Sequence, residues 1–299
     1  MLALASAGCS SSGGGASGPG PGGTATGGTA MGGAGGTTSF QAGTGLISLG
    51  SAGTQTSRIG SNGTRLVERA DNAMFATTIG NRDVNVTLPR TGGQVLEAGD
   101  PRNPLGTRAT LTVYETESGD FLDGTRREES LAVVDTRYAS LIAYDLSVGF
   151  ETTRSAVAVG PADADTPRGV PTAGTATYSG IATGGSVNEL GGSEEFEGTL
   201  SLRADFGAGT VGGRLDDDTS DRAILLEDGR ISGADYSGTA RVVEGTTQIV
   251  TSDGPGDRSR FAGGFFGPRA DETAGLVEVT GTQNGVDVEV LGAFLGVKD

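Results

Sequence analysis

Few side chains of this 299-residue chain have the chemistry that catalysis requires. The sequence contains no His and a single Cys, Cys9. Without His, the chain lacks Ser-His-Asp and Cys-His nucleophile pairs, imidazole-bound zinc and histidine-ligated haem. One Cys permits neither an intramolecular disulfide nor a thiolate metal cluster. We therefore expect a protein that is not an enzyme, with no catalytic, cofactor-binding or metal-binding residues.

The acidic residues offer one metal-like spacing. Asp216, Asp218, Ser220 and Glu227 fall at positions 1, 3, 5 and 12 of an EF-hand calcium loop. Position 6, where that loop needs Gly, is Asp221, and the flanking residues resemble strands rather than helices. A solvated acidic loop is the better interpretation.

Two further groups of residues could take part in catalysis or in ligand binding. The adjacent carboxylates Glu128–Glu129 and Glu194–Glu195 are of the type that glycosidases use, but they lie in polar stretches without an aromatic sugar platform. Two tyrosines of the C-terminal half, Tyr178 and Tyr236, are candidate axial ligands of haem. Tyr236 alternates with inward-facing residues, so packing is its expected role.

The charge restricts the partners. The net charge is −16, of which residues 171–299 contribute 21 acids and 9 bases, net −12. Such a surface repels the phosphates of nucleic acid and does not dock on anionic lipid through a basic patch. It attracts a protein partner that carries a basic patch.

The first nine residues predict a membrane anchor. An apolar run from Met1 ends in Ala7 and Gly8, directly before Cys9. This arrangement resembles the end of a bacterial lipoprotein signal, in which small residues precede an acylated Cys. Ser6 stands where that signal usually has Leu, and the run is shorter than a whole signal. Lipid attachment at Cys9 is our interpretation, and an ordinary N-terminus with an incidental Cys is the alternative.

Residues 10–39 predict a disordered tether. Ser10–Ser39 contains 13 Gly and no charged residue, and so cannot bury enough apolar surface to fold. A Gly-rich coil of this length spans about 30 Å on average. It would hold a folded module away from a membrane, or serve as a linker with no purpose beyond separation.

The C-terminal part, residues 171–299, predicts a closed antiparallel barrel. In Phe196–Phe206, apolar or Gly residues alternate with polar ones over eleven positions. Turn residues such as Gly207–Gly209, Asp228-Gly229 and Asn284-Gly285 separate the runs. The expected strands are Thr175–Thr183, Phe196–Phe206, Thr210–Asp216, Ala223–Ile231, Ala234–Val242, Ser259–Phe266, Ala274–Thr280 and Asp287–Val297. Eight short strands with one apolar face can close into a barrel that side chains fill.

The barrel interior is expected to be narrow, with no ligand cavity. Four Gly fall on the inward face among Phe and Leu residues, where they allow tight bends, namely Gly198, Gly213, Gly238 and Gly263. The opposite face of Phe196–Phe206 carries Glu, Arg and Asp, which excludes a lipid-facing strand.

Three motifs in this region resemble a known family. Gly169–Gly180 is similar to the opening strand of the transferrin-binding-protein-B-like barrels, and Gly292–Gly296 to their closing strand. Phe261–Gly275 resembles the family's strand–turn–strand motif, in which Pro268 ends a strand, Ala270–Glu272 can form one helical turn and Gly275 needs a small residue. The resemblance implies a lipid-anchored outer-membrane lipoprotein, exposed on the bacterial surface, whose relatives bind host iron carriers, haemoglobin or complement regulators.

Similar proteins carry a β-rich handle before the barrel, and residues 40–170 are interpreted as such a region. Strands are expected at Asn72–Ile79, Asn81–Leu88, Arg108–Thr116, Leu131–Thr136 and Leu141–Phe150. In Asp287–Val297 both faces are apolar, which is typical of a strand covered on both sides. A handle packed there would explain it, and a dimer contact is the rival.

Two functions are consistent with the sequence. The first is a surface-displayed binding lipoprotein for a protein or for an iron- or haem-bearing ligand. The second is a structural envelope lipoprotein without a specific soluble ligand. Exposed aromatic clusters on the loops at one barrel end would favour binding, and uniformly small, polar loops would favour the structural role.

Overall fold

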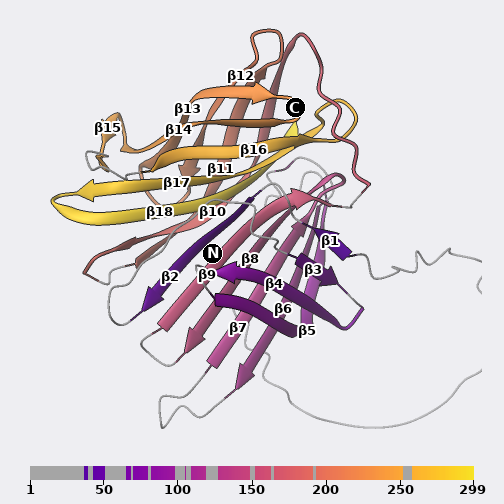
Figure 1. Ribbon diagram of the computed structural model, residues 1–299, viewed down its shortest axis with the longest axis vertical. Coiled ribbons are helices and arrows are strands. Elements are labelled where there is room, and N and C mark those ends of the chain that lie inside the picture. The colour runs from indigo at the N-terminus through magenta and orange to yellow at the C-terminus, as the bar shows by residue number, and fades with distance from the viewer. Residues whose placement is uncertain are drawn as a thin grey trace, which may run out of the picture.

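The computed structural model describes residues 37–39, 43–50, 65–68, 70–79, 82–97, 105, 109–118, 127–148, 152–162, 165–190, 193–251 and 258–299. Within these ranges every regular element is a β-strand, which confirms the all-β prediction (Figure 1). Across the same ranges, no helix is long and apolar enough to cross a membrane. The predicted lipid attachment at Cys9, with the whole of residues 1–36, lies outside the described residues.

The C-terminal strands form one sheet. They are β10 (Thr175–Asn188), β11 (Ser193–Asp205), β12 (Thr210–Asp217), β13 (Arg222–Ser232), β14 (Asp235–Glu244), β15 (Thr247–Gln248), β16 (Ser259–Phe266), β17 (Glu272–Gln283) and β18 (Val286–Lys298). Their order is β13-β12-β11-β10-β18-β17-β16-β14-β15. An additional antiparallel pairing of β13 with β14 joins the two sides of this sheet. Eight strands thus close into an antiparallel barrel, with β15 outside the ring, and the predicted barrel is confirmed.

The N-terminal strands form a second sheet. They are β1 (Thr37–Ser39), β2 (Gly43–Gly50), β3 (Arg65–Glu68), β4 (Asn72–Ile79), β5 (Arg82–Leu96), β6 (Ala109–Ser118), β7 (Arg127–Asp135), β8 (Ala139–Val148) and β9 (Thr152–Pro161). Their order is β1-β3-β4-β5-β6-β7-β8-β9-β2, so β1 and β2 occupy opposite edges although they are neighbours in sequence. We call this sheet the handle.

Several strands of the structure were not predicted from the sequence. Neither β2 and β9 nor the short strands β1, β3 and β15 were predicted. The last three residues of the predicted tether, Thr37–Ser39, form β1, because Thr and Ser there extend the ladder of β3. Asp228-Gly229 is a bulge inside β13 rather than a turn between strands, since the left-handed φ of 52° at Asp228 suits either geometry.

The handle covers one outer wall of the barrel. An apolar cluster joins Leu141 and Val159 of β8 and β9 to Leu276 of β17 and to Leu291 and Leu295 of β18. This layer accounts for the two apolar faces of β18: the inward face fills the barrel and the outward face packs on the handle. Figure 1 shows the handle strands lying beneath β17 and β18. The outward face is therefore covered within the chain.

Candidate binding surface at the barrel mouth

The barrel has one end at which β10, β12 and β17 finish and β11, β13 and β18 begin, and we call residues 188–190, 193–196, 217–222, 244–251 and 283–288 the mouth. The cavity below it has a volume of about 50 Å³. Sites for small-molecule ligands are usually about 300–1,000 Å³. Its lining is largely apolar, from Phe196, Leu215, Ile224, Val242, Ile249, Val250, Val288 and Val290, with polar side chains from Ser186, Glu194, Glu195, Asp217, Arg222 and Gln283. The barrel interior at this end is therefore core, as its Gly-rich strands predicted, and not a ligand cavity.

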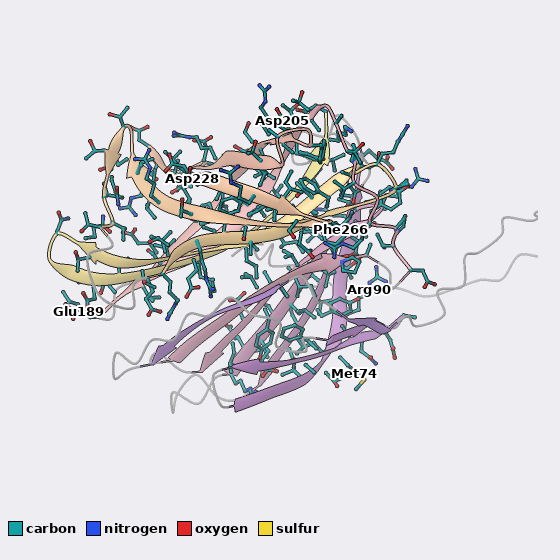
Figure 2. The ribbon with its side chains drawn as sticks, turned by 45° about the horizontal axis from the view of Figure 1, so that its top comes forward. Met74, Arg90, Glu189, Asp205, Asp228 and Phe266 are labelled. Carbon is teal, nitrogen blue, oxygen red and sulfur yellow. The ribbon has the colours of Figure 1, made fainter. Side chains whose placement is uncertain are left out.

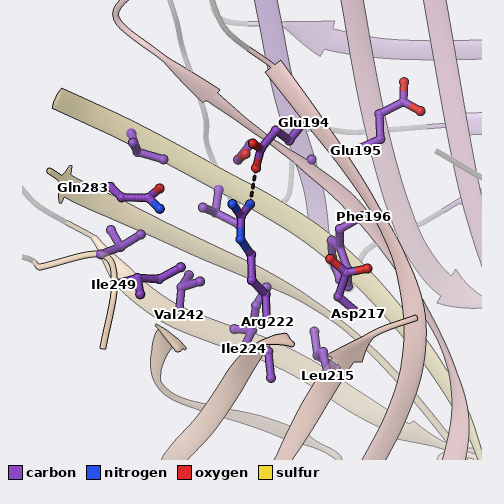
Figure 3. A pocket seen from close by; sticks show the side chains of 16 residues that line it. Glu194, Glu195, Phe196, Leu215, Asp217, Arg222, Ile224, Val242, Ile249 and Gln283 are labelled. Atoms are coloured by element: carbon purple, nitrogen blue, oxygen red, sulfur yellow. Dashed lines mark hydrogen bonds and ion pairs between the residues drawn. The ribbon is translucent and has the colours of Figure 1, made fainter. Parts of the chain in front are cut away.

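An ion pair lies over this cavity. Arg222 of β13 donates to the carboxylate of Glu194 of β11, and this hydrogen bond raises the pKa of Arg222 (Figure 3). The two strands are separated by β12, so the pair spans the end of β12 at the mouth. Figure 3 shows the Glu195 carboxylate pointing away from Glu194. A pair this exposed contributes little to stability.

The mouth is strongly acidic. Eight carboxylates lie on its loops and strand ends: Glu189, Glu194, Glu195, Asp217, Asp218, Asp221, Glu244 and Asp287. Burial opposes ionisation of Asp217, but hydrogen bonds from Ser220 and Thr219 outweigh it and lower the pKa of this carboxyl. Arg222 is already paired with Glu194. The mouth therefore presents an excess of negative charge at neutral pH.

One large apolar side chain stands out of this acidic surface. Leu190, between β10 and β11, is 78% exposed. Its backbone N–H donates to Asn188 Oδ1 at 3.0 Å, and the neighbouring Glu189 N–H donates to Asp287 O at 3.0 Å. These bonds hold Leu190 beside the tip of the β17–β18 hairpin. Leu190 is thus an exposed apolar residue surrounded by charged ones.

Aromatic side chains fill the opposite end of the barrel. Phe265 contacts the rings of Tyr178, Phe206 and Tyr236 at centroid distances of 5.7, 5.3 and 5.0 Å. Both tyrosine hydroxyls have partners, since Tyr178 donates to Ala270 O at 2.7 Å and Tyr236 shares a 2.6 Å bond with Thr273 Oγ1. Tyr236 thus has the packing role that its alternation predicted, and neither phenol faces an open space of haem size.

Burial controls the ionisation of three tyrosines. It raises the pKa of Tyr144, Tyr178 and Tyr236 far above 10. In the unfolded chain they ionise near pH 10, so their contribution to stability is complete below about pH 10 and is lost as the pH rises above it. In that pH range, each of the three tyrosines lowers the free energy of unfolding by about 1.4 kcal/mol per pH unit. In a titration followed by tyrosinate absorbance, we expect these three to ionise only together with unfolding. Ionisation of all five tyrosines near pH 10 in a folded chain would contradict this.

The strand–turn–strand motif forms part of the contact between the barrel and the handle. β16 ends at Phe266 and β17 begins at Glu272, with a turn between them in which Gly267 and Ala270 have φ of 88° and 53°. The predicted helical turn over Ala270–Glu272 is therefore wrong, because Ala270 adopts a left-handed conformation. At Gly275 an added Cβ would lie 2.4 Å from the ring of Phe294, which confirms the need for a small residue.

Glu272 of this motif is a contact that the sequence did not predict. Its carboxylate is 3% exposed and accepts bonds from Thr136 Oγ1 at 2.5 Å and from the Tyr138 N–H at 2.9 Å, both in the β7–β8 turn of the handle. Burial raises its pKa, against the opposing effect of these hydrogen bonds. The motif therefore includes the residue that fastens the barrel to the handle.

The EF-hand-like residues do not converge in the structure. Asp216 pairs with Arg214, whereas Glu227 lies further along β13 and accepts two bonds from Arg241, at 2.7 and 3.0 Å. Among the residues that the structure describes, no group of three or more His, Cys, Asp or Glu side chains is arranged to hold a metal ion.

The adjacent glutamates are also separated. Neighbouring residues on a strand point to opposite faces, so neither pair directs two carboxylates at one bond. Glu129 is buried beside Arg127 and Tyr144, while Glu128 is exposed.

Comparisons with known proteins place the barrel in a family. Residues 170–298 match the family model described as the C-lobe and N-lobe beta barrels of Tf-binding protein B. None of the curated proteins compared with the chain matches it.

Several solved structures resemble the chain. A double mutant of transferrin binding protein B from Haemophilus parasuis Hp5 is 14% identical, with a TM-score of 0.44 and coverage of 79% of this chain and 54% of that one. The isotype 1 protein from serogroup B Neisseria meningitidis is 14% identical, with a TM-score of 0.40 and coverage of 79% and 52%. HpuA from Kingella denitrificans, in complex with human haemoglobin, is 13% identical, with a TM-score of 0.36 and coverage of 88% and 89%.

The chain spans about half the length of the transferrin binding protein B chains that it matches. Residues 170–298 match this family model and include the closed eight-stranded ring. The barrel of this chain therefore belongs to the family of transferrin-binding protein B β-barrels.

Proposed function

We propose that this protein is a lipid-anchored surface protein of the bacterial outer membrane that binds a partner protein through the mouth of its barrel and is not an enzyme. The observation that carries this proposal is the mouth itself, where an exposed Leu190 stands among eight carboxylates. Membership of the barrel in the transferrin-binding protein B family supports it.

The filled barrel favours a protein partner over a free small ligand. The cavity of about 50 Å³ cannot admit haem, and the hydroxyls of Tyr178 and Tyr236 are engaged inside the core. An acidic surface recognises a partner with a complementary basic patch, and the long-range attraction speeds their encounter. Names of the similar proteins refer to transferrin and haemoglobin, and these are the first partners to test.

The anchor is proposed from the sequence. Cys9 stands between an apolar run and a charge-free segment, and stable attachment requires several acyl chains because one binds membranes only marginally. Mass spectrometry of the native protein is expected to find an N-terminal, acylated Cys9. An unmodified thiol, or residues 1–8 still attached, would contradict the anchor without affecting the mouth.

Binding by the mouth is tested with the immobilised chain from residue 37 onward, which contains both sheets. We expect transferrin, human haemoglobin or a basic protein from host serum to be retained, and retention to weaken at high salt because the Debye length falls to about 3 Å at 1 M. Leu190→Ser and a triple Asp217→Asn, Asp218→Asn, Asp221→Asn variant should each lower affinity at least about tenfold.

The controls lie away from the mouth. Val95→Ser removes an apolar side chain that is 43% exposed on the handle, and Asp165→Asn removes an exposed charge before β10. Neither should change retention. Equal losses in the controls would place the contact elsewhere, and no retained protein at all would favour a structural envelope role.

A further inference from the structure

An open groove of about 510 Å³ lies on the outer wall of the barrel across β11, β12 and β13. Described handle elements contact β10, β17 and β18, on other sides of the barrel. Asp205 and Asp228, two of the groove residues, are seen in Figure 2 on the part of the barrel remote from the handle. The groove is separate from the mouth and independent of the function proposed above.

The groove holds the two unpaired arginines of the barrel. Nine arginines lie between residues 165 and 299, and seven of them form ion pairs: Arg168, Arg214, Arg222, Arg241, Arg258, Arg260 and Arg269. Within the described part of the chain, Arg203 and Arg230 form neither an ion pair nor a hydrogen bond, and both line the groove. Partners are not scarce, since residues 171–299 contain 21 acids.

The strand register sets the spacing of the charged groups in the groove. Arg203 lies opposite Gly212, which has no side chain, and the bulge in β13 places Asp228 on the far side of Gly212. In the next row, Asp205 and Arg230 lie on either side of Thr210. The two residues of each row are therefore separated by two strand spacings, about 10 Å.

The four charges form an alternating arrangement around the groove floor. One row reads Arg203, Gly212, Asp228 and the other reads Asp205, Thr210, Arg230. Asp228 holds its place through a left-handed φ of 52°, beside Gly229, whose Cβ position is closed by Val211 O at 2.2 Å. Non-Gly residues in this conformation are uncommon and often occur at functional positions.

We infer that this groove binds a small zwitterion, a short peptide with a free ammonium and a free carboxylate. An arginine guanidinium can donate two parallel hydrogen bonds to the C-terminal carboxylate of the peptide. An aspartate carboxylate can accept a hydrogen bond from the N-terminal ammonium group. A dipeptide or tripeptide spans about 7–10 Å when extended, which matches the distance across a row. The two arginines and two aspartates together carry no net charge. The aspartates therefore repel a dianion such as phosphate, and the groove does not favour its binding.

The test uses NMR chemical-shift titration of the full chain with triglycine, since exposed ion pairs are weak and a Kd of the order of 1 mM is expected. Shifts are expected at residues 203–212 and 226–230. N-acetyl-triglycine and triglycine amide, which each lack one terminal charge, should bind at least about fivefold more weakly.

Single substitutions distinguish specific binding of triglycine in the groove from a general effect of the protein's charge. Arg230→Gln and Asp228→Asn should each weaken triglycine binding at least about fivefold, whereas Arg214→Gln, on the same outer face but paired with Asp216, should not. The inference is overturned by an absence of shifts in the groove, by a one-charge analogue that binds as tightly as triglycine, or by inorganic phosphate that binds more tightly than triglycine. Because the mouth is untouched by these variants, failure here leaves the proposed protein-binding function standing.

Discussion

Replacing Gly198 with alanine is expected to open the barrel. A Cβ at this position would lie 1.7 Å from the carbonyl oxygen of Asp216 and 2.7 Å from its carbonyl carbon, both in the adjacent strand β12. Backbone atoms cannot move aside as a flexible side chain can, so β11 and β12 must separate or shift in register. Overpacking in a core costs about 1–3 kcal/mol where side chains adjust, and the cost at this backbone contact should reach about 3 kcal/mol or more.

Urea unfolding followed by circular dichroism measures this change, with the midpoint and slope compared against the unsubstituted chain. Gly207→Ala is the matched control: it lies in the β11–β12 turn, where the nearest atom to an added Cβ is Asp205 Oδ1 at 3.4 Å. That variant should retain the original midpoint. A Gly198→Ala protein with unchanged stability would show that close approach of these strands is not required for closure.

The second large effect is expected at Glu272. Glu272→Ala removes the acceptor of the bonds from Thr136 Oγ1 and the Tyr138 N–H, and leaves these handle donors buried or poorly solvated. Hydrogen bonds to a charged group contribute about 1.5–3 kcal/mol each, so the loss should be about 3 kcal/mol or more. The β7–β8 turn should also become accessible to proteases, because its fastening to β17 is gone.

Glu272→Gln refines this test. It preserves the shape of the side chain but replaces one acceptor oxygen by an N–H₂ group that faces other donors, so an intermediate loss is expected. Glu189→Ala removes an exposed carboxylate and should change stability by less than about 0.5 kcal/mol. If Glu272→Ala unfolds at the same urea concentration and resists proteolysis, the apolar cluster alone holds the handle to the barrel.

The local periodicity was sufficient to predict most of the strands. All eight ring strands were located from residues 175 onward, and Asn72–Ile79 was predicted with its observed bounds, since alternation and turn residues act over a few positions. Strands in which alternation is weak were missed, as with β9, whose sequence carries Ala and Val on neighbouring positions. Strand ends also differed, since β10 continues to Asn188 through pairing with both β11 and β18.

The all-β class, the filled barrel and the acidic charge could be predicted from the amino-acid sequence, because they follow from composition and from spacings of two residues. The contacts between distant groups could not be predicted in this way. The β13–β14 pairing closes the ring, Glu272 reaches a turn 136 residues earlier at Thr136, and the outer face of β18 is covered by the handle. Arg203 and Arg230 share a groove because both lie on the outer face of neighbouring strands, on either side of β12. Such contacts depend on strand register and closure, which alternation leaves undetermined, since every shift by two residues preserves the same faces.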